Sequence, residues 1–339
     1  MLIEVSSGIP ENELKLIIEH LAGHEDVRAW PVRLSGRLFV AVSGDEALVP
    51  PVDSPVVIGA WSTTERGYRL VARESGIAPG VVKIGSSSVG GGSFWAAAGP
   101  CALESFEDAL ATAEVLAAAG ADAIRMGLFK PRSSPYHFQG KGRQGLRMLA
   151  EIRAAVGLPV VTEVLDPRDV GVVAEVADCL QVDTRNMGNR ALLAELGAID
   201  RPVLLMRGLR SSVTDWLRAA EYVMSRGNPN IVLCARGVVS FDDSLTFQPD
   251  YGAILAVRRH TELPVIFDPS HSTGRLDAVA PAALAAAVFG VDGLLIESHL
   301  APERMHRPGD ADQMYRPERI ADLLRGCQEA RGVASSLLA

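Results

Sequence analysis

The chain has 339 residues, 48% of them hydrophobic and only 5% aromatic, and a formal net charge of −8. Its lysines and arginines are scattered rather than grouped, which disfavours nucleic-acid binding but leaves room for a small cationic pocket that binds an anionic metabolite. This is the composition of a soluble α/β enzyme.

The cysteines and the N-terminus indicate the compartment. The N-terminus lacks a basic-then-apolar signal pattern, and no apolar run approaches the ~18–20 residues of a membrane span. The cysteines have no paired spacing, which is typical of cytosolic thiols (Cys101, Cys179, Cys234 and Cys327). We predict a cytoplasmic protein without a membrane segment.

Residues 2–63 predict a small α+β unit. LIEV (2–5) indicates a strand, residues 11–21 an amphipathic helix, and residues 27–44 a hairpin. Three prolines in EALVPPVDSPV (46–56) argue against a long helix there. We therefore predict an appendage over residues 1–75, regulatory or truncated, ahead of a catalytic domain over residues 76–339.

VKIGSSSVGGGSF (82–94) is rich in glycine and serine and predicts a hairpin or linker that closes the bottom of the catalytic domain. Apolar runs then recur at 94–99, 123–127, 159–164, 179–183, 202–207, 230–236, 264–270 and 293–298. Helical patterns separate several of them, at 105–119, 144–156, 213–226, 251–259 and 279–289.

These runs are continuously hydrophobic rather than alternating, which marks parallel strands buried on both faces. Eight of them, with helix-length segments between, predict a (β/α)8 TIM barrel. A doubly wound open sheet is the competing architecture, but AAAGPCALE (96–104) is a poor match to its glycine-rich phosphate loop.

The residues at the predicted strand ends fall into two chemical groups, and catalytic residues of such barrels come from these ends. One group offers sulfur, nitrogen and oxygen, a mixture suited to a divalent transition metal (Cys101, His271, Glu297 and Asp310). The other is cationic and suits carboxylates and phosphates (Arg125, Lys130, Arg132, Arg185 and Arg236). Taken singly, each residue also has a purely structural interpretation, and spacing alone leaves the metal undecided.

Seven stretches of the chain form a specific pattern: AGPCALES (98–105), IRMGLFKPRSSPYHFQGKG (124–142), VVTEVLD (160–166), RNMGN (185–189), GNPNIVLCARG (227–237), DPSHSTGRLD (268–277) and GLLIESH (293–299). Together they resemble the 3-deoxy-D-arabino-heptulosonate 7-phosphate (DAHP) synthases, in their shorter microbial subtype. The 3-deoxy-octulosonate 8-phosphate synthases are related. The resemblance covers nearly the whole chain, because residues 1–75 look like the ferredoxin-like domain of that subtype.

The resemblance implies a metal-dependent aldol-type condensation, the first step of the shikimate pathway of aromatic amino acid biosynthesis. In that reaction phosphoenolpyruvate (PEP) donates C3 to the aldehyde of erythrose 4-phosphate, water adds at C2, and phosphate leaves. The metal, Mn2+, Co2+, Fe2+ or Zn2+, would be held by the residues that match the family's ligands (Cys101, His271, Glu297 and Asp310).

The resemblance also implies substrate contacts. Arg125 and Lys130 would meet PEP, with Arg185 and Arg236 on its phosphate, and Arg132 and Ser133 on the acceptor phosphate. Lys130 would also give a proton to the aldehyde oxygen. The catalytic candidates are Lys130, Glu163 and Asp268.

The chain departs from the family pattern at four places. Met206 replaces the lysine after strand 5, Ala235 replaces a glutamate, and Asp183-Thr184 replaces Gly-Ala. SLTFQPD (244–250) stands where the family has ATRNTLD. Arg207 and Arg210 are both candidates to replace the missing lysine, with Arg207 as the substrate-binding cation that we predict.

Three functions therefore remain open. They are a DAHP synthase, a diverged enzyme of secondary metabolism with a different donor or acceptor, and a non-catalytic partner of a shikimate- or chorismate-pathway enzyme. We expect small anionic substrates and a homodimer or homotetramer.

Overall fold

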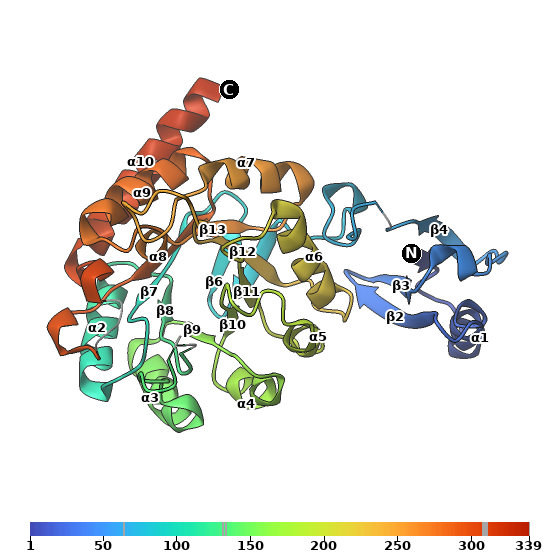
Figure 1. The fold of residues 1–339 in the computed structure, drawn as a ribbon, viewed down its shortest axis with the longest axis horizontal. Helices are drawn as coiled ribbons and strands as arrows, with labels where there is room; N and C mark the ends of the chain where they lie inside the picture. The colour runs from blue at the N-terminus through green and yellow to red at the C-terminus, as the bar shows by residue number, and fades with distance from the viewer. Residues whose placement is uncertain (64, 131, 133, 307–310, 339) are drawn as a thin grey trace.

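The computed structural model describes residues 1–63, 65–130, 132, 134–306 and 311–338. It consists of a closed barrel and a smaller N-terminal sheet at the side of that barrel (Figure 1). No helix in the described ranges combines the length and the apolar character that crossing a membrane requires.

The barrel contains eight strands among the described residues, and each is parallel to its neighbours in the closed order β10-β11-β12-β13-β14-β7-β8-β9. They are β7 (Trp95–Gly99), β8 (Ala123–Arg125), β9 (Val160–Glu163), β10 (Cys179–Val182), β11 (Val203–Met206), β12 (Ile231–Ala235), β13 (Val265–Phe267) and β14 (Gly293–Glu297). Every one of these strand residues is buried, as continuous hydrophobicity predicted. The TIM barrel is confirmed, and the open doubly wound sheet is wrong.

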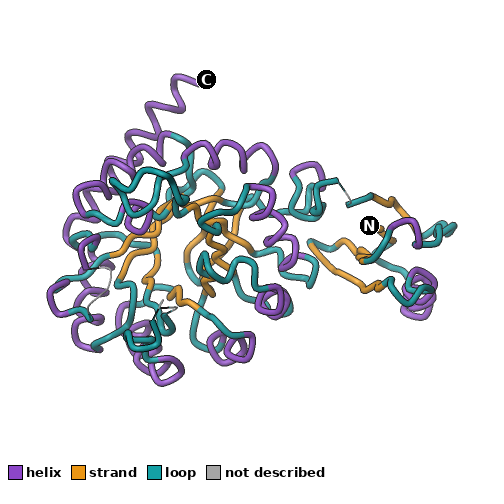
Figure 2. Tube along the Cα trace, in the orientation of Figure 1, coloured by secondary structure: helices purple, strands orange, loops and turns teal. Residues whose placement is uncertain are grey.

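Helices surround the strands (Figure 2). They are α2 (Phe106–Ala118), α3 (Leu146–Val156), α4 (Val170–Ala174), α5 (Arg190–Gly197), α6 (Val213–Met224), α7 (Tyr251–His260), α8 (Pro269–Thr273), α9 (Leu276–Val288) and α10 (Ile320–Leu338). Side-chain caps fix several starts: Ser105 caps α2, Asn189 caps α5, and Ser212 forms a capping box with Asp215 on α6. The sequence placed the start of α9 at residue 279, whereas the helix begins at Leu276.

A hairpin closes the N-terminal end of the barrel. β5 (Val81–Ile84) and β6 (Ser87–Gly90) pair in antiparallel fashion, which confirms the predicted hairpin. Val82, Ile84 and Val89 are buried in one cluster with residues that face the barrel interior. Because side chains fill this end, the carboxyl ends of the strands provide the mouth where a site can form.

The N-terminal sheet has the strand order β2-β3-β1-β4 and is antiparallel throughout. Its elements are β1 (Leu2–Val5), α1 (Glu11–Leu21), β2 (Arg28–Leu34), β3 (Arg37–Ser43) and β4 (Val57–Trp61). This is the ferredoxin-like order, in which a second helix normally precedes β4. Here a single 3-10 turn (Glu46–Leu48) stands in its place, as the three prolines that follow lead us to expect. The sequence pattern did not predict β4.

The N-terminal sheet and its connecting segment are attached to α6. The carboxylate of Glu221 accepts hydrogen bonds from the backbone N–H groups of Arg69, Leu70 and Val71 at 2.9, 2.9 and 3.0 Å. The indole Nε1 of Trp30 donates to the Ser225 carbonyl at 2.9 Å. The division of domains after residue 75 stays a prediction, since residues 69–71 are bonded directly to a barrel helix.

Glu221→Ala should lower the free energy of unfolding by about 1–3 kcal/mol, because it leaves three backbone donors without their acceptor. Urea denaturation measures the change, and Glu195→Ala, which removes an exposed carboxylate from α5, is the matched control. Equal stability of the two variants would show that Glu221 does not hold the connecting segment.

Candidate active site and metal centre

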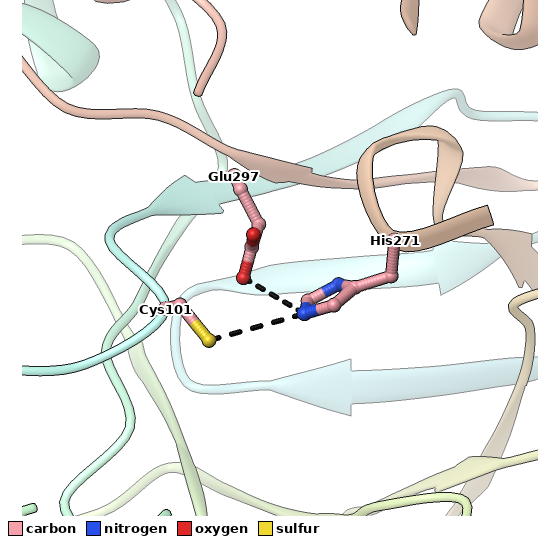
Figure 3. A group of neighbouring side chains, drawn as sticks. All are labelled: Cys101, His271 and Glu297. Atoms are coloured by element: carbon pink, nitrogen blue, oxygen red, sulfur yellow. Dashed lines mark hydrogen bonds and ion pairs between the residues drawn. The ribbon is translucent and has the colours of Figure 1, made fainter. Parts of the chain in front are cut away.

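Cys101, His271 and Glu297 meet at the mouth of the barrel (Figure 3). Their sulfur, nitrogen and oxygen atoms all lie within 4.8 Å of one another, and all three residues are buried. Cys101 follows β7, His271 lies in α8 just after β13, and Glu297 ends β14. Gly99 lets β7 and β8 approach: its φ is 152°, and a Cβ there would lie 2.3 Å from the Arg125 carbonyl oxygen.

Asp268 orients the His271 ring. One Asp268 oxygen accepts from the His271 backbone N–H at 2.9 Å and so caps α8. The other lies 2.7 Å from His271 Nδ1, so this nitrogen carries the proton and Nε2 faces Glu297 Oε1 at 3.0 Å and Cys101 Sγ at 3.8 Å. Although burial opposes it, the charges of Asp268 and Glu297 raise the pKa of His271.

Glu297 is held in place on both of its oxygens. Oε1 accepts from Arg125 Nη1 at 2.8 Å, and Oε2 accepts from the Gln313 side chain in the short turn Ala311–Gln313. Burial acts to raise the pKa of Glu297, but His271 and Arg125 lower it well below its usual range. The carboxylate is therefore ionised, as a metal ligand must be.

The three donor atoms suit a divalent transition metal. A thiol, an imidazole and a carboxylate are ligands for Zn2+, Mn2+, Fe2+ or Co2+, and Asp268 supplies the outer hydrogen bond that orients a ligating histidine. Asp310, the fourth predicted ligand, lies outside the described residues.

Lys130 and Glu163 lie beside this group. Lys130 Nζ is 3.4 Å from Glu163 Oε2, and both side chains are buried. Burial lowers the pKa of Lys130, but Cys101 and Glu163 more than reverse this and raise it, so the lysine is a cation at neutral pH. The pKa of Glu163 is raised by burial against the effect of Lys130. Glu163 Oε1 is buried without a hydrogen-bond partner within the described part of the chain.

A second cation lies on the other side of the mouth. Arg236, just after β12, has its Nη1 3.6 Å from Asp183 Oδ1 and 3.1 Å from the Thr184 hydroxyl. Its guanidinium carbon lies 5.4 Å from the centre of the Phe247 ring. The contacts of Asp183 and Thr184, two residues that depart from the family pattern, with Arg236 were not predicted from the sequence.

The remaining predicted cations lie in different surroundings. Arg207 donates through Nη1 to Asp250 at 2.6 Å and through Nε to the Ser211 carbonyl at 2.9 Å, so it binds loop groups rather than the residues around Lys130. Arg132 Nε donates to the Phe138 carbonyl at 3.4 Å. Arg185 contributes its backbone N–H to Asp183. Ser133 lies outside the described residues.

Two glutamines belong to the site although the sequence pattern did not predict them. Gln313 donates to Glu297 Oε2. Gln181 lies inside β10, where its Oε1 accepts from Arg125 Nε at 3.3 Å and its Nε2 lies 3.8 Å from Met206 Sδ. An amide in the otherwise apolar run CLQV (179–182) was the available signal, because a buried polar side chain requires partners.

Comparisons with known proteins agree with this geometry. The chain is 35% identical over 306 residues to phospho-2-dehydro-3-deoxyheptonate aldolase of Thermotoga maritima, a match that covers 90% of each protein. It is 34% identical over 250 residues to 2-dehydro-3-deoxyphosphooctonate aldolase of Acidithiobacillus ferrooxidans, covering 68% of this chain and 87% of that relative.

Solved structures also show similarity to a DAHP synthase. The crystal structure of the Thermotoga maritima DAHP synthase superposes with a TM-score of 0.74 at 32% identity, covering 99% of this chain and 97% of that one. A truncated form of the Thermotoga maritima enzyme gives a TM-score of 0.71 at 35% identity, covering 80% of this chain and 98% of the other. The model of the DAHP synthetase I family matches residues 81–331. The chain therefore belongs to the DAHP synthetase I family.

Proposed function

We propose that this chain condenses PEP with erythrose 4-phosphate to give DAHP and inorganic phosphate. The observation that carries the proposal is the group of Cys101, His271 and Glu297 beside Lys130 at the barrel mouth, in a chain similar over nearly its full length to a DAHP synthase. In the reaction a bond forms between C3 of PEP and the aldehyde carbon, water adds at C2, and the bond from C2 to the phosphate oxygen breaks.

Cys101, His271 and Glu297, with Asp310 as the predicted fourth ligand, would hold one divalent ion. Such an ion, when bound, supplies Lewis-acid stabilisation for the aldehyde oxygen as it gains negative charge. Arg125 keeps Glu297 ionised and in position, and Asp268 holds the His271 ring in its orientation.

Lys130 holds the proton that the aldehyde oxygen takes up as the new carbon–carbon bond forms. Glu163 positions the ammonium, and its own raised pKa suits a group that exchanges a proton with a neighbour. We propose Lys130, Glu163 and Asp268 as the catalytic set, with Asp268 acting through His271.

The substrates carry phosphate and carboxylate groups, which need cationic side chains around them. Arg125, Lys130, Arg185 and Arg236 are proposed for PEP, and Arg132 with Ser133 for the acceptor phosphate. Arg207 is the remaining substrate-binding candidate from the sequence, but its ion pair with Asp250 favours a supporting role at the start of α7 instead.

The test is phosphate release from PEP and erythrose 4-phosphate with Mn2+ present, with identification of DAHP by mass spectrometry. Turnover supports the proposal. PEP that stays intact with every phosphorylated aldose tried would favour a different donor or a non-catalytic partner role.

A diverged donor is the second candidate, and Met206 favours it. Its side chain is fully buried in the barrel interior beside Gln181, at the position where family members are expected to carry a lysine. Methionine fills a similar volume without charge, so the barrel accepts the exchange while the pocket loses a cation.

Met206→Lys should therefore tighten PEP binding by about 1.5–3 kcal/mol, the free energy of a charge-assisted hydrogen bond. Calorimetry with PEP and no acceptor measures this. Met206→Leu, which changes shape without charge, is the control. Equal PEP affinity in all three proteins would show that Met206 has no part in the choice of donor.

A further inference from the structure

Asp183 places a carboxylate among the cations that are proposed to bind PEP. It directly follows β10 and is 8% exposed. Its Oδ1 lies 3.6 Å from Arg236 Nη1, while its Oδ2 accepts from the Arg185 backbone N–H at 3.3 Å and from the Thr184 hydroxyl at 3.4 Å. These two hydrogen bonds, one from the backbone and one from a hydroxyl, hold the carboxylate so that it faces the guanidinium.

Asp183 is ionised in this position. Burial acts to raise its pKa, but Arg236 and Lys130 outweigh burial and lower it. The same negative charge contributes to raising the pKa of Glu163. Asp183 therefore interacts with both sides of the mouth, with Arg236 on one side and with the Lys130–Glu163 pair on the other.

Arg236 is only partly satisfied by these contacts. Its Nη1 donates to Thr184 and lies farther from Asp183 than a direct hydrogen bond allows, and its guanidinium carbon lies over the Phe247 ring. Its Nε is buried and has no hydrogen-bond partner among the residues that the structure describes. A buried guanidinium nitrogen whose hydrogen is not used needs a further acceptor, and a phosphate oxygen provides one.

We propose that Asp183 is a specificity-determining residue that competes with a substrate phosphate for Arg236 and so weakens the binding of highly charged donors. This rests on the proposed function in one respect, namely that Arg236 binds the donor phosphate. The carboxylate reduces the positive charge available to a phosphate by one, and any phosphate that reaches Arg236 lies close to a fixed like charge. The site therefore binds PEP less tightly than it would without Asp183, and it discriminates less against donors that carry less negative charge.

Asp183→Asn tests this, because asparagine keeps the shape and can still accept from the Arg185 N–H while the charge is lost. The probes are PEP, inorganic phosphate and pyruvate, titrated calorimetrically without acceptor. We expect the variant to bind PEP and phosphate about tenfold more tightly, the size of one charge-assisted contact, and pyruvate within about twofold of wild type.

Asp250→Asn is the matched control. Asp250 also pairs with an arginine at a strand end and also caps a backbone N–H, but its partner is Arg207. The PEP affinity of the Asp250→Asn variant should equal that of wild type.

In an Arg236→Gln background, Asp183→Asn should no longer change phosphate affinity, which identifies Arg236 as the residue through which Asp183 acts.

Unchanged or weaker phosphate binding by a folded Asp183→Asn protein overturns the proposal. So does an equal gain for pyruvate, which would indicate a general change of charge rather than a phosphate site, and so does a gain that persists without Arg236. Thermal melting checks that each variant is folded, and Asp183→Ser provides a second neutral variant. Failure of this proposal is distinguishable from failure of the proposed function. If the wild-type protein is inactive on PEP and erythrose 4-phosphate, Asp183→Asn can still bind phosphate tenfold more tightly than wild type.

Discussion

Cys101→Ser should lower the affinity for Mn2+ or Zn2+ by at least about 100-fold and abolish metal-dependent condensation. Even the loss of an outer-shell partner typically costs 10–100-fold in metal affinity, and here a thiolate ligand is replaced by a hydroxyl that stays protonated. The change is also local, since Cys101 is buried beside His271 and serine is nearly the same size. Titration calorimetry and metal analysis after dialysis against a chelator measure the effect.

Cys327→Ser is the control, because Cys327 is equally buried but lies in α10, away from the barrel mouth. It should keep about one bound ion per chain. If Cys101→Ser keeps wild-type metal affinity, or if wild-type protein turns over at full rate in excess chelator, Cys101 is not a ligand of a required metal.

Lys130→Met should reduce kcat by about 10²–10⁴, the range that a positioned proton donor contributes. Methionine keeps the length and the apolar stem but removes the proton and the charge. The substitution also leaves Glu163 buried without its cation. We expect metal binding to survive, because Cys101, His271 and Glu297 are unchanged, while turnover is lost. Steady-state kinetics with metal analysis of the same preparation separates the two effects.

Lys141→Met, in the same loop after β8, controls for a general loss of positive charge near the mouth and should keep kcat. Lys130→Met combined with Glu163→Gln removes the uncompensated carboxylate. If the double variant regains turnover, Lys130 serves only to neutralise Glu163 and is not the proton donor.

Much of the barrel could be predicted from sequence because its strands are buried on both faces. Continuous runs such as PVVTEV (159–164) indicate parallel strands without any tertiary information, and eight of them in one chain indicate a closed barrel. The same logic places Cys101, His271 and Glu297 at one mouth, because parallel strands bring their carboxyl ends together. Their predicted proximity is confirmed, whereas their roles stay proposals.

β4 could not be predicted with the same ease. VIGAW (57–61) is short, alternates between intermediate and exposed positions, and follows three prolines, so it lacks the pattern that marks a buried strand. It forms because β1 offers it an antiparallel partner on its open edge, from Leu2 opposite Trp61 to Val5 opposite Val57. Pairing across more than fifty residues is decided by tertiary structure, not by local propensity.

The sequence by itself determined the family, the barrel and the chemical types of group at its mouth, because these depend on residue identity and on hydrophobic pattern along the chain. Only the tertiary structure decided which charges meet. Arg207 and Arg236 both follow barrel strands, yet Arg207 pairs with Asp250 in the loop after β12, and Arg236 faces Asp183, which follows β10. A long side chain can reach several loops from one backbone position, so its partner is set by where the loops bring opposite charge and not by its place in the sequence.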